Sequence, residues 1–461
     1  MVVRIVAHRL SVAGQLFNLT DPAAETVAGH FTAWAPAVLR WGADDGLEPL
    51  EPATLSVTVT VPVGARLPSF GDRVELDGRI LTAGNDTVFH LFTGRVDTAE
   101  RDYRTLTLPD RTRVKVHQIT LEAADDTAQL RRIRLSDEPW PAESSADRQG
   151  RIAALVADQV TLADDVFTIN GQSFPVAPRD VDSFSALEAL ELLAAATPQR
   201  IEARRDGIGA TSEPLYGAVL ELPTGAEPWI DRSPTTVPNL DARVLTDGPR
   251  TLDTSSVITH VEMTYRVYEP DDDGDLELTD RTLSVRDRDA ALTYGENKWR
   301  LETDFIDTRT TPELPAWPEQ SPEAMLLPRL RRIQDARRRE FWAMPEVEVL
   351  LDSPVWDEYP PSRQNGLVQL LAEGLRSGAL LGIRGAPGDV DPYYRIAAGE
   401  LELAADPALA RLIFQLEPET FAAPRSLAYA DLTLETDQLS RFSALTFDEL
   451  ATVGRTQRTG A

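Results

Sequence analysis

An acidic stretch, residues 269–280, has the residue types and spacing closest to a metal site. With Gly274 at the sixth position of a calcium loop, carboxylates occupy the first, third, fifth and twelfth positions: Glu269, Asp271, Asp273 and Asp280. Carboxylate oxygens at this spacing bind Ca²⁺ in helix–loop–helix sites. Here the flanks alternate like strands, and an aspartate replaces the usual bidentate glutamate at the twelfth position. We therefore favour a solvated acidic turn, with calcium as the alternative.

An arginine run within residues 329–339 is the second chemically unusual segment. Its members are Arg329, Arg331, Arg332, Arg337, Arg338 and Arg339. Such a run is either a solvated helix face, partly neutralised by Asp335 and Glu340, or a seam that docks onto an acidic patch of a neighbouring subunit. It lacks the interleaved aromatic residues typical of nucleic-acid binding. The sharper hypothesis is a subunit interface at this run, and the solvated face remains open.

Signatures of catalysis are missing from the sequence. There is no cysteine, no G-x-S-x-G elbow, no S-x-x-K and no phosphate-binding glycine loop before a lysine. Neither an HExxH pair nor any other metal-binding spacing occurs among the five histidines: His8, His30, His90, His117 and His260. A Ser-His-Asp triad stays open because its members meet only in three dimensions. We expect no catalytic residue, no cofactor, no enzyme activity and no metal beyond the calcium alternative.

Length and charge narrow the class of protein further. A chain of 461 residues is expected to form two to four domains. Its net charge of -28 makes it a poor general binder of DNA, because nucleic acid is bound by neutralising phosphates. No apolar stretch reaches the length of a signal peptide or a membrane span, so we expect no membrane insertion.

The elements that would position these residues are mainly strands. Residues 55–61 alternate between apolar and polar side chains, and similar short segments with Gly and Asp turns continue to residue 121. Strands return at 257–265 and 276–285, and again near the C-terminus: 346–351, 380–384, 394–402 and 411–416. A glycine interrupts the strands at 92–97 and 396–402 in the same way, just before another strand. This echo predicts two related barrels.

Helices are predicted between and after the two strand-rich parts. Ser144 with Asp147, and Ser185 with Glu188, are pairs that cap helix N-termini. Ile152, Leu155 and Val156 would form the buried face of the first helix, and a strand at 166–169 is expected between the two. A third helix is predicted from Ser321, with its apolar face at Leu326, Leu330 and Ile333.

Four short segments resemble minor tail proteins of long-tailed phages of actinobacteria. Leu91 to Asp97 is similar to their FxGxV strand, and Ser136 to Ser144 to their DEPWPxES segment before a helix, here continuing through Arg148 and Arg151. Asp289 to Asp304 is similar to a DxxSxxxYGxRxxxxxTD stretch. Leu445 to Leu450 is similar to a closing TWDxL, with Phe447 in place of the tryptophan.

The resemblance implies a virion protein similar to a baseplate hub. The fold class would be α+β, mainly β, with two small antiparallel β-barrel-like domains flanking an α/β insert. The predicted domains are residues 1–121, with an N-terminal insertion that the resemblance does not cover, 122–215 for the insert, 216–425 with a helix at 321–341, and a C-terminal extension at 426–461.

The function that follows is structural, in the tail tip of a siphovirus, where the protein would join the tube to the tip and take part in adsorption and DNA ejection. The expected partners are further copies in a homotrimer, the distal tail or tail tube protein, the tape-measure protein and other minor tail proteins. Genomic DNA would only pass through. The protein would be made in the host cytoplasm. The alternatives are a hexameric distal tail ring protein, a tip-borne cell-wall hydrolase, or a glycan-binding protein that uses Trp34, Trp41, Trp140 and Trp317.

Overall fold

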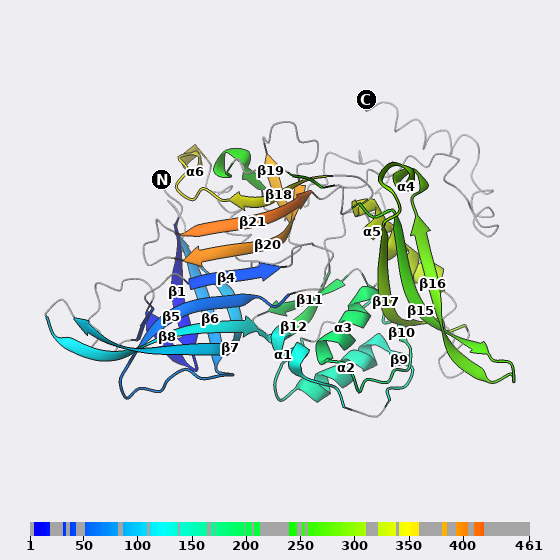
Figure 1. Cartoon of the computed structure of the whole chain (residues 1–461), viewed down its shortest axis with the longest axis horizontal. Helices are drawn as coiled ribbons and strands as arrows, with labels where there is room; N and C mark the ends of the chain where they lie inside the picture. The colour runs from blue at the N-terminus through cyan, green and yellow to red at the C-terminus, as the bar shows by residue number, and fades with distance from the viewer. Residues whose placement is uncertain are drawn as a thin grey trace. The chain divides into compact units, whose positions relative to one another are not determined.

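The structure is a computed structural model of the whole chain. It describes residues 4–418 apart from 19–30, 34–36, 43–50, 82–85, 108–110, 137–138, 164–166, 170, 198, 205–206, 213–238, 247–250, 254–256, 310–320, 338–340, 359–379, 385–392 and 404–409. No helix in this described part is both long enough and apolar enough to span a membrane. The mainly β, α+β fold class is confirmed (Figure 1).

The N-terminal strands form the first half of a fourteen-stranded sheet. They are β1 (Arg4–Val12), β2 (Gln15–Asn18), β3 (Phe31–Ala33), β4 (Ala37–Gly42), β5 (Thr54–Pro62), β6 (Arg73–Leu81), β7 (Asp86–Thr107) and β8 (Arg113–Asp125). Alternate residues of β5 and β6 are buried, as the sequence pattern predicted. Strand β8 pairs with β5 as well as with β7, so this half of the sheet curls back on itself in a barrel-like way.

The C-terminal strands continue the same sheet instead of forming a separate one. They are β13 (Asn239–Asp241), β14 (Thr251–Asp253), β18 (Phe341–Glu348), β19 (Leu380–Arg384), β20 (Tyr393–Leu403) and β21 (Arg411–Pro418). Strand β4 joins the two halves, because it pairs with β5 on one side and with β20 on the other. One apolar core serves both. The sequence pattern could not reveal this join, since β4 lies in the insertion of uncertain placement.

A second sheet belongs to the helical part of the chain. Its order is β16 (Leu276–Arg286), β15 (His260–Pro270), β17 (Lys298–Ile306), β10 (Pro175–Val176) and β9 (Glu143–Ser144). We expected the β15–β16 hairpin in the second barrel-like part, but Val261 and Met263 bury their side chains in the core of the insert. The domain bounds themselves remain predictions.

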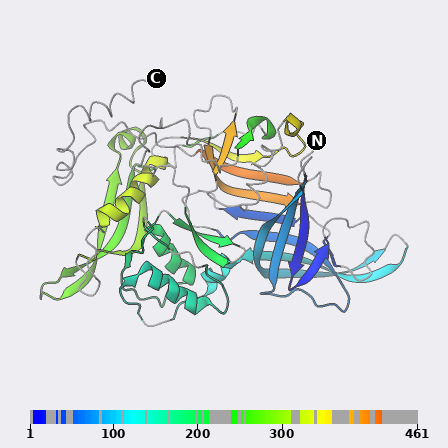
Figure 2. The same ribbon diagram turned by 180° about the vertical axis from the view of Figure 1, so that it is seen from behind.

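The same part of the chain contains most of the described helices. They are α1 (Asp126–Arg132), α2 (Ser145–Val156), α3 (Ala186–Ala195), α4 (Arg288–Tyr294) and α5 (Pro322–Arg337). Helix α5 packs on β15 and β16, and α3 on β17 (Figure 2). A hairpin of β11 (Gln199–Arg204) and β12 (Gly207–Ser212) completes the insert. Two short turns, η1 (Ala242–Val244) and α6 (Val355–Glu358), lie beside the large sheet.

The predicted helix starts are confirmed. Ser144 caps α2 by accepting the Asp147 N–H, and Ser185 forms a full capping box with Glu188 at α3. Two details differ from the prediction. Leu155 is exposed, because the buried face of α2 consists of Ser145, Arg148, Gln149, Ile152 and Val156. Among the described residues of the predicted strand at 166–169, only Ile169 forms an isolated bridge, to Gln172.

Candidate functional site

The acidic stretch at 269–280 lies at the end of the β15–β16 hairpin, and its carboxylates do not converge. Glu269 Oε1 accepts a hydrogen bond from Arg281 Nε at 2.8 Å. Asp280 lies opposite Arg266, 3.6 Å from its Nε. Asp271 accepts the backbone N–H groups of Asp273 and Asp275 at 2.9 and 2.8 Å.

Two of the four calcium candidates, Glu269 and Asp280, therefore face arginines, and Asp271 closes a turn. No group of three or more His, Asp or Glu side chains in the described part of the chain is arranged to hold a metal ion. The arrangement is that of an acidic hairpin turn, in which the aspartate side chain bonds to the backbone two residues further on.

The arginine run at 329–339 divides between the interior and the surface. Arg337 is buried, and its Nη2 donates to Glu417 Oε2 of β21 at 2.7 Å. This ion pair places Arg337 in the interior of its own chain, and the subunit interface at the arginine run stays a prediction. Arg331 is exposed and Arg329 half-buried. The side chains of Arg332, Arg338 and Arg339 lie outside the described residues.

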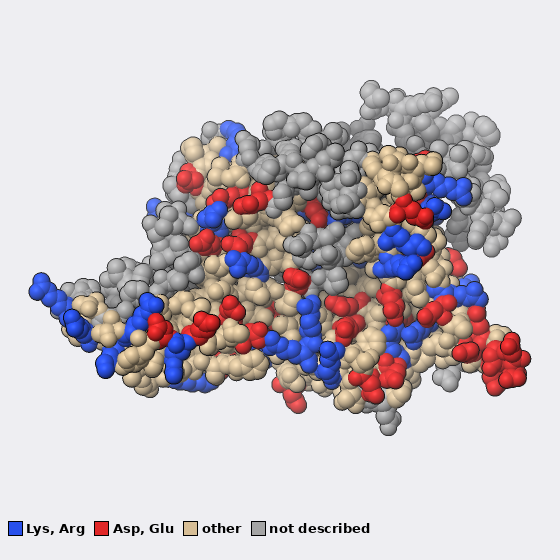
Figure 3. Space-filling view, in the orientation of Figure 1, with Lys and Arg blue, Asp and Glu red and all other residues tan. Residues whose placement is uncertain are grey.

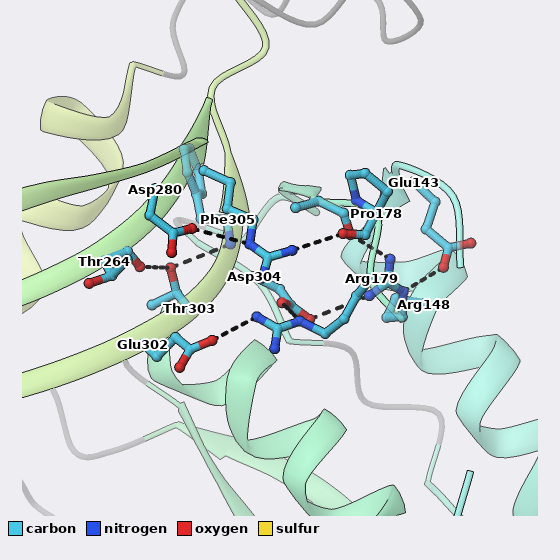
Figure 4. A network of polar contacts seen from close by, with 12 residues as sticks. Glu143, Arg148, Pro178, Arg179, Thr264, Asp280, Glu302, Thr303, Asp304 and Phe305 are labelled. Atoms are coloured by element: carbon cyan, nitrogen blue, oxygen red, sulfur yellow. Dashed lines mark hydrogen bonds and ion pairs between the residues drawn. The ribbon is translucent and has the colours of Figure 1, made fainter. Parts of the chain in front are cut away.

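The most developed polar cluster is a buried network centred on Asp304 of β17 (Figure 4). Arg148 of α2 donates from Nε to Glu143 Oε1 at 2.5 Å, and its Nη1 lies 3.4 Å from Asp304 Oδ2. Its Nη2 donates to the Pro141 and Ala177 carbonyls at 3.0 and 2.8 Å. The guanidinium of Arg148 also lies over the Trp140 ring, 5.0 Å from its centroid.

A second arginine completes this network from the other side of Asp304. Arg179 Nε donates to Asp304 Oδ1 at 2.5 Å, and its Nη2 donates to Glu302 Oε1 at 2.9 Å. Arg266 Nη1 donates to the Pro178 carbonyl at 3.0 Å. Burial raises the pKa of the Asp304 carboxyl and lowers that of the Arg148 guanidinium, and their ion pairs oppose both shifts.

The network joins two of the segments that carry the phage-tail resemblance. Trp140 and Glu143 come from the DEPWPxES segment, and Asp304 ends the Thr-Asp pair of the second stretch. Arg148 is 1% exposed, so no substrate reaches its guanidinium in this arrangement. The cluster links β9, α2 and β17, and it is built to hold the insert together.

A buried carboxylate with no cation among its described partners lies where β8 leads into α1. Asp125 ends β8 and caps α1, where it accepts hydrogen bonds from the N–H groups of Thr127 and Ala53, both at 2.9 Å. Burial is the largest influence on this carboxyl and raises its pKa to about 6. This site could not be predicted from local patterns, because its donor Ala53 lies 72 residues away in the chain.

The remaining candidates take ordinary structural places. His90 lies between Asp77 at 3.0 Å and Thr93 at 2.8 Å within the large sheet. Trp41 and Trp140 are 5% and 1% exposed, so neither offers a ring surface to a glycan. Trp34 and Trp317 lie outside the described residues, as do the closing segment 445–450 and His30.

Two exposed hairpins of opposite charge were not recognised from the sequence as a pair. Basic side chains gather along the outer part of β7–β8, and acidic ones at the end of β15–β16 (Figure 3). Residues 100–115 hold five basic and three acidic residues, whereas 269–280 hold seven acidic and no basic residues. The signal in the sequence was the spacing of Arg113 and Lys115, which places both on one face of a strand.

No protein-family model matches this sequence, and no curated protein matches it. Among solved structures, the chain is similar to a tail protein from Neisseria meningitidis MC58, with 10% identity, 90% of this chain and 96% of that chain covered, and a TM-score of 0.48. A 43 kDa tail protein of prophage MuSo2 from Shewanella oneidensis has 11% identity, covers 90% and 98%, and scores 0.46. The E. coli c3393 protein, a type VI secretion system component with structural similarity to T4 bacteriophage tail proteins, has 9% identity, covers 90% and 77%, and scores 0.40.

Proposed function

We propose that this chain is a structural, non-enzymatic component of a bacteriophage tail, and specifically a hub or minor tail protein of the tip. The observation that carries the proposal is the Asp304 network. Two segments about 150 residues apart that resemble the same family of tail proteins meet there in one buried cluster. Because the likenesses to solved tail proteins have low scores, the proposal rests on these segments and their contacts.

The polar chemistry of the described residues favours assembly over turnover. The charged cluster around Asp304 is buried and satisfied internally, as expected of a group that holds a fold together. Exposed charges of one sign gather at the ends of the two hairpins, where they can act between chains. The partners we propose are further copies in a homotrimer, a distal tail or tube protein, the tape-measure protein and other minor tail proteins.

The acidic balance suits a chain past which DNA is ejected. A ring of chains with a net charge of -28 each would repel phosphates, which discourages adhesion of DNA in transit. The expected location is the virion, at the tail tip. A lumen that proved neutral or basic in the assembled ring would remove this part of the proposal.

Three measurements test the proposal. Mass spectrometry of purified particles should find the chain in constant proportion to the other tail proteins, and the mass of the isolated assembly should correspond to three copies. Six copies would favour the distal tail ring alternative. Absence from particles, or a clear lysis band when the chain is run in a gel containing host peptidoglycan, would refute the structural role and favour the hydrolase.

A further inference from the structure

The outer end of the β7–β8 hairpin, which we call the basic arm, is defined by residues 98–107 and 111–115. Strand β6 pairs with β7 only as far as Arg95, and β5 pairs with β8 only from Val116 onward. From residue 98 outward, β7 has β8 on one side and no described strand on the other, and residues 105–107 with 113–115 form a two-stranded ribbon. A lone two-stranded ribbon is marginally stable in water, so the outermost part of the arm is expected to gain support from a partner.

One face of the basic arm carries cations and no carboxylate. Residues that lie directly opposite in an antiparallel pair share a face, and Tyr103 pairs with His117, Thr105 with Lys115 and Thr107 with Arg113. The face therefore consists of Arg101, Tyr103, Thr105, Thr107, Arg113 and Lys115. Asp102 pairs with Arg104 on the opposite face, at 2.8 Å. Arg101 and Arg113 form no ion pair with any other described residue.

An exposed aromatic ring lies in the middle of this cationic face. Tyr103 is 51% exposed, with Lys115 Nζ 5.8 Å from the centroid of its ring. A large apolar surface surrounded by unpaired cations has the composition of a binding site for an acidic partner with an apolar anchor.

The end of the β15–β16 hairpin, residues 269–280, has the complementary composition and is called the acidic tip here. Strand β17 accompanies β15 only to Arg266, so the tip is also a two-stranded ribbon, and β16 is an edge strand. Glu269 lies directly opposite Glu277, a pairing of like charges that destabilises a hairpin by itself. Leu276 beside them is 50% exposed.

From these features we propose that the basic arm of one copy of this chain binds the acidic tip of a second copy. Both elements are ribbons that project past the strands that support them. Each has an exposed apolar residue at its centre, and their charges are opposite. Because the two surfaces differ, the contact is head-to-tail, a type that closes into a ring when the rotation between copies permits and otherwise extends into a filament. This inference rests on the proposed function, since it names the contact by which copies of a tail protein assemble.

The absence of cysteine makes a direct test possible. Two preparations of the full chain with different tags, one Tyr103→Cys and the other Leu276→Cys, are mixed and oxidised mildly. The expected result is a disulfide between chains with different tags. The matched control replaces Leu276→Cys by Leu292→Cys, since Leu292 is 86% exposed on α4 and outside the acidic tip. The yield should exceed that of the control about tenfold, as a contact worth roughly 1.4 kcal/mol would give.

Charge reversal shows whether the contact depends on the proposed charges. Arg101→Glu, Arg113→Glu and Lys115→Glu combined should reduce the disulfide to the control level, and Asp271→Lys, Asp272→Lys and Asp273→Lys in the other chain should restore it. In 1 M salt the yield of the disulfide between the Tyr103→Cys and Leu276→Cys chains should fall, because the Debye screening length shortens to about 3 Å. Disulfides only between chains with the same tag, a yield equal to the control, or a yield insensitive to charge reversal would overturn the inference.

Nucleic acid is the other partner that a cationic face could bind. Fluorescence anisotropy with a labelled DNA duplex should give the same result for the unaltered chain and for the chain with the reversed arm charges. DNA binding by the unaltered chain that disappears on charge reversal would overturn the inference. Failure of the arm contact and failure of the proposed function give different results. A chain that is found in particles but gives no disulfide between copies refutes only the arm contact, whereas a disulfide with no chain in particles refutes the tail role.

Discussion

The Asp304 network and the two charged hairpin ends treat charge in opposite ways. In the network, Arg148 and Arg179 are nearly inaccessible and share one buried carboxylate. On the basic arm, Arg101 and Arg113 are exposed and form no ion pair with any described residue, and the acidic tip has seven carboxylates with no basic residue among them. Burial of a charge demands a partner in the same chain, whereas exposure leaves the partner to be supplied by another molecule.

This difference indicates where the fold and the function lie. Breaking the network should destabilise the protein and leave its specificity for partners untouched. Altering the hairpin ends should do the reverse. The following substitutions, ordered from the largest expected effect to the smallest, separate the two regions.

Removing the shared carboxylate of the network should have the largest effect. Asp304→Ala leaves Arg148 and Arg179 without their common anion, and breaking a buried pair in this way costs about 3–5 kcal/mol. Denaturant unfolding of the purified chain measures this loss in the free energy of unfolding. The control is Glu302→Ala, which removes only a 60% exposed partner of Arg179 and should cost less than about 1 kcal/mol. Equal losses for both variants would show that the network does not hold the insert.

The buried Asp125 should make stability depend on pH. Its pKa in the folded chain, about 6, lies above the unfolded value near 4, so the folded state binds more protons between these values. The contribution of Asp125 to the free energy of unfolding is fully present below about pH 4. It is lost as the pH rises through 6, and the total loss is about 3 kcal/mol. In Asp125→Asn this component should disappear. Parallel pH profiles of unfolding for both proteins would contradict the assignment.

The interrupting glycine of β7 should resist a side chain. A Cβ at Gly94 would lie 2.3 Å from the Ala124 carbonyl oxygen, so Gly94→Ala forces the backbones apart and should cost about 1–3 kcal/mol. Gly150 in α2 has no atom within 4 Å of the same position, and Gly150→Ala should stabilise the helix by about 1 kcal/mol. Thermal unfolding of the two variants compares them, and a tolerated alanine at position 94 would contradict the close packing.

The basic arm should contribute least to stability. The combined reversal of Arg101, Arg113 and Lys115 to glutamate should change the free energy of unfolding by no more than about 0.5 kcal/mol per residue, because these side chains are exposed. Denaturant unfolding under the conditions used for Asp304→Ala makes the comparison direct. A loss as large as that of Asp304→Ala would mean that the arm charges hold the fold.

Local patterns predicted local structure well in this chain. The alternation of residues 55–61 gave β5, and the serine–glutamate pair at 185 and 188 gave the start of α3, because both depend on neighbours in sequence. Strand pairing over long distances was not accessible. Nothing in residues 37–42 shows that β4 will lie between β5 and β20.

The candidate sites were predicted less well, for a related reason. A ligand spacing at 269–280 was visible, but the arginines that engage Glu269 and Asp280 come from the facing strand and flank. Arg337 was grouped with surface arginines because its partner, Glu417, lies 80 residues away. The residues of the Asp304 network lie in two segments that resemble phage tail proteins. Only the folded structure shows that these two segments are in contact.

We propose that this protein works through contacts between chains in a phage tail. Electron microscopy of purified particles, with an antibody against the chain, can locate it. The label should be confined to the free end of the tail. Particles that carry no label, while the chain is found unassembled in the lysate, would contradict it.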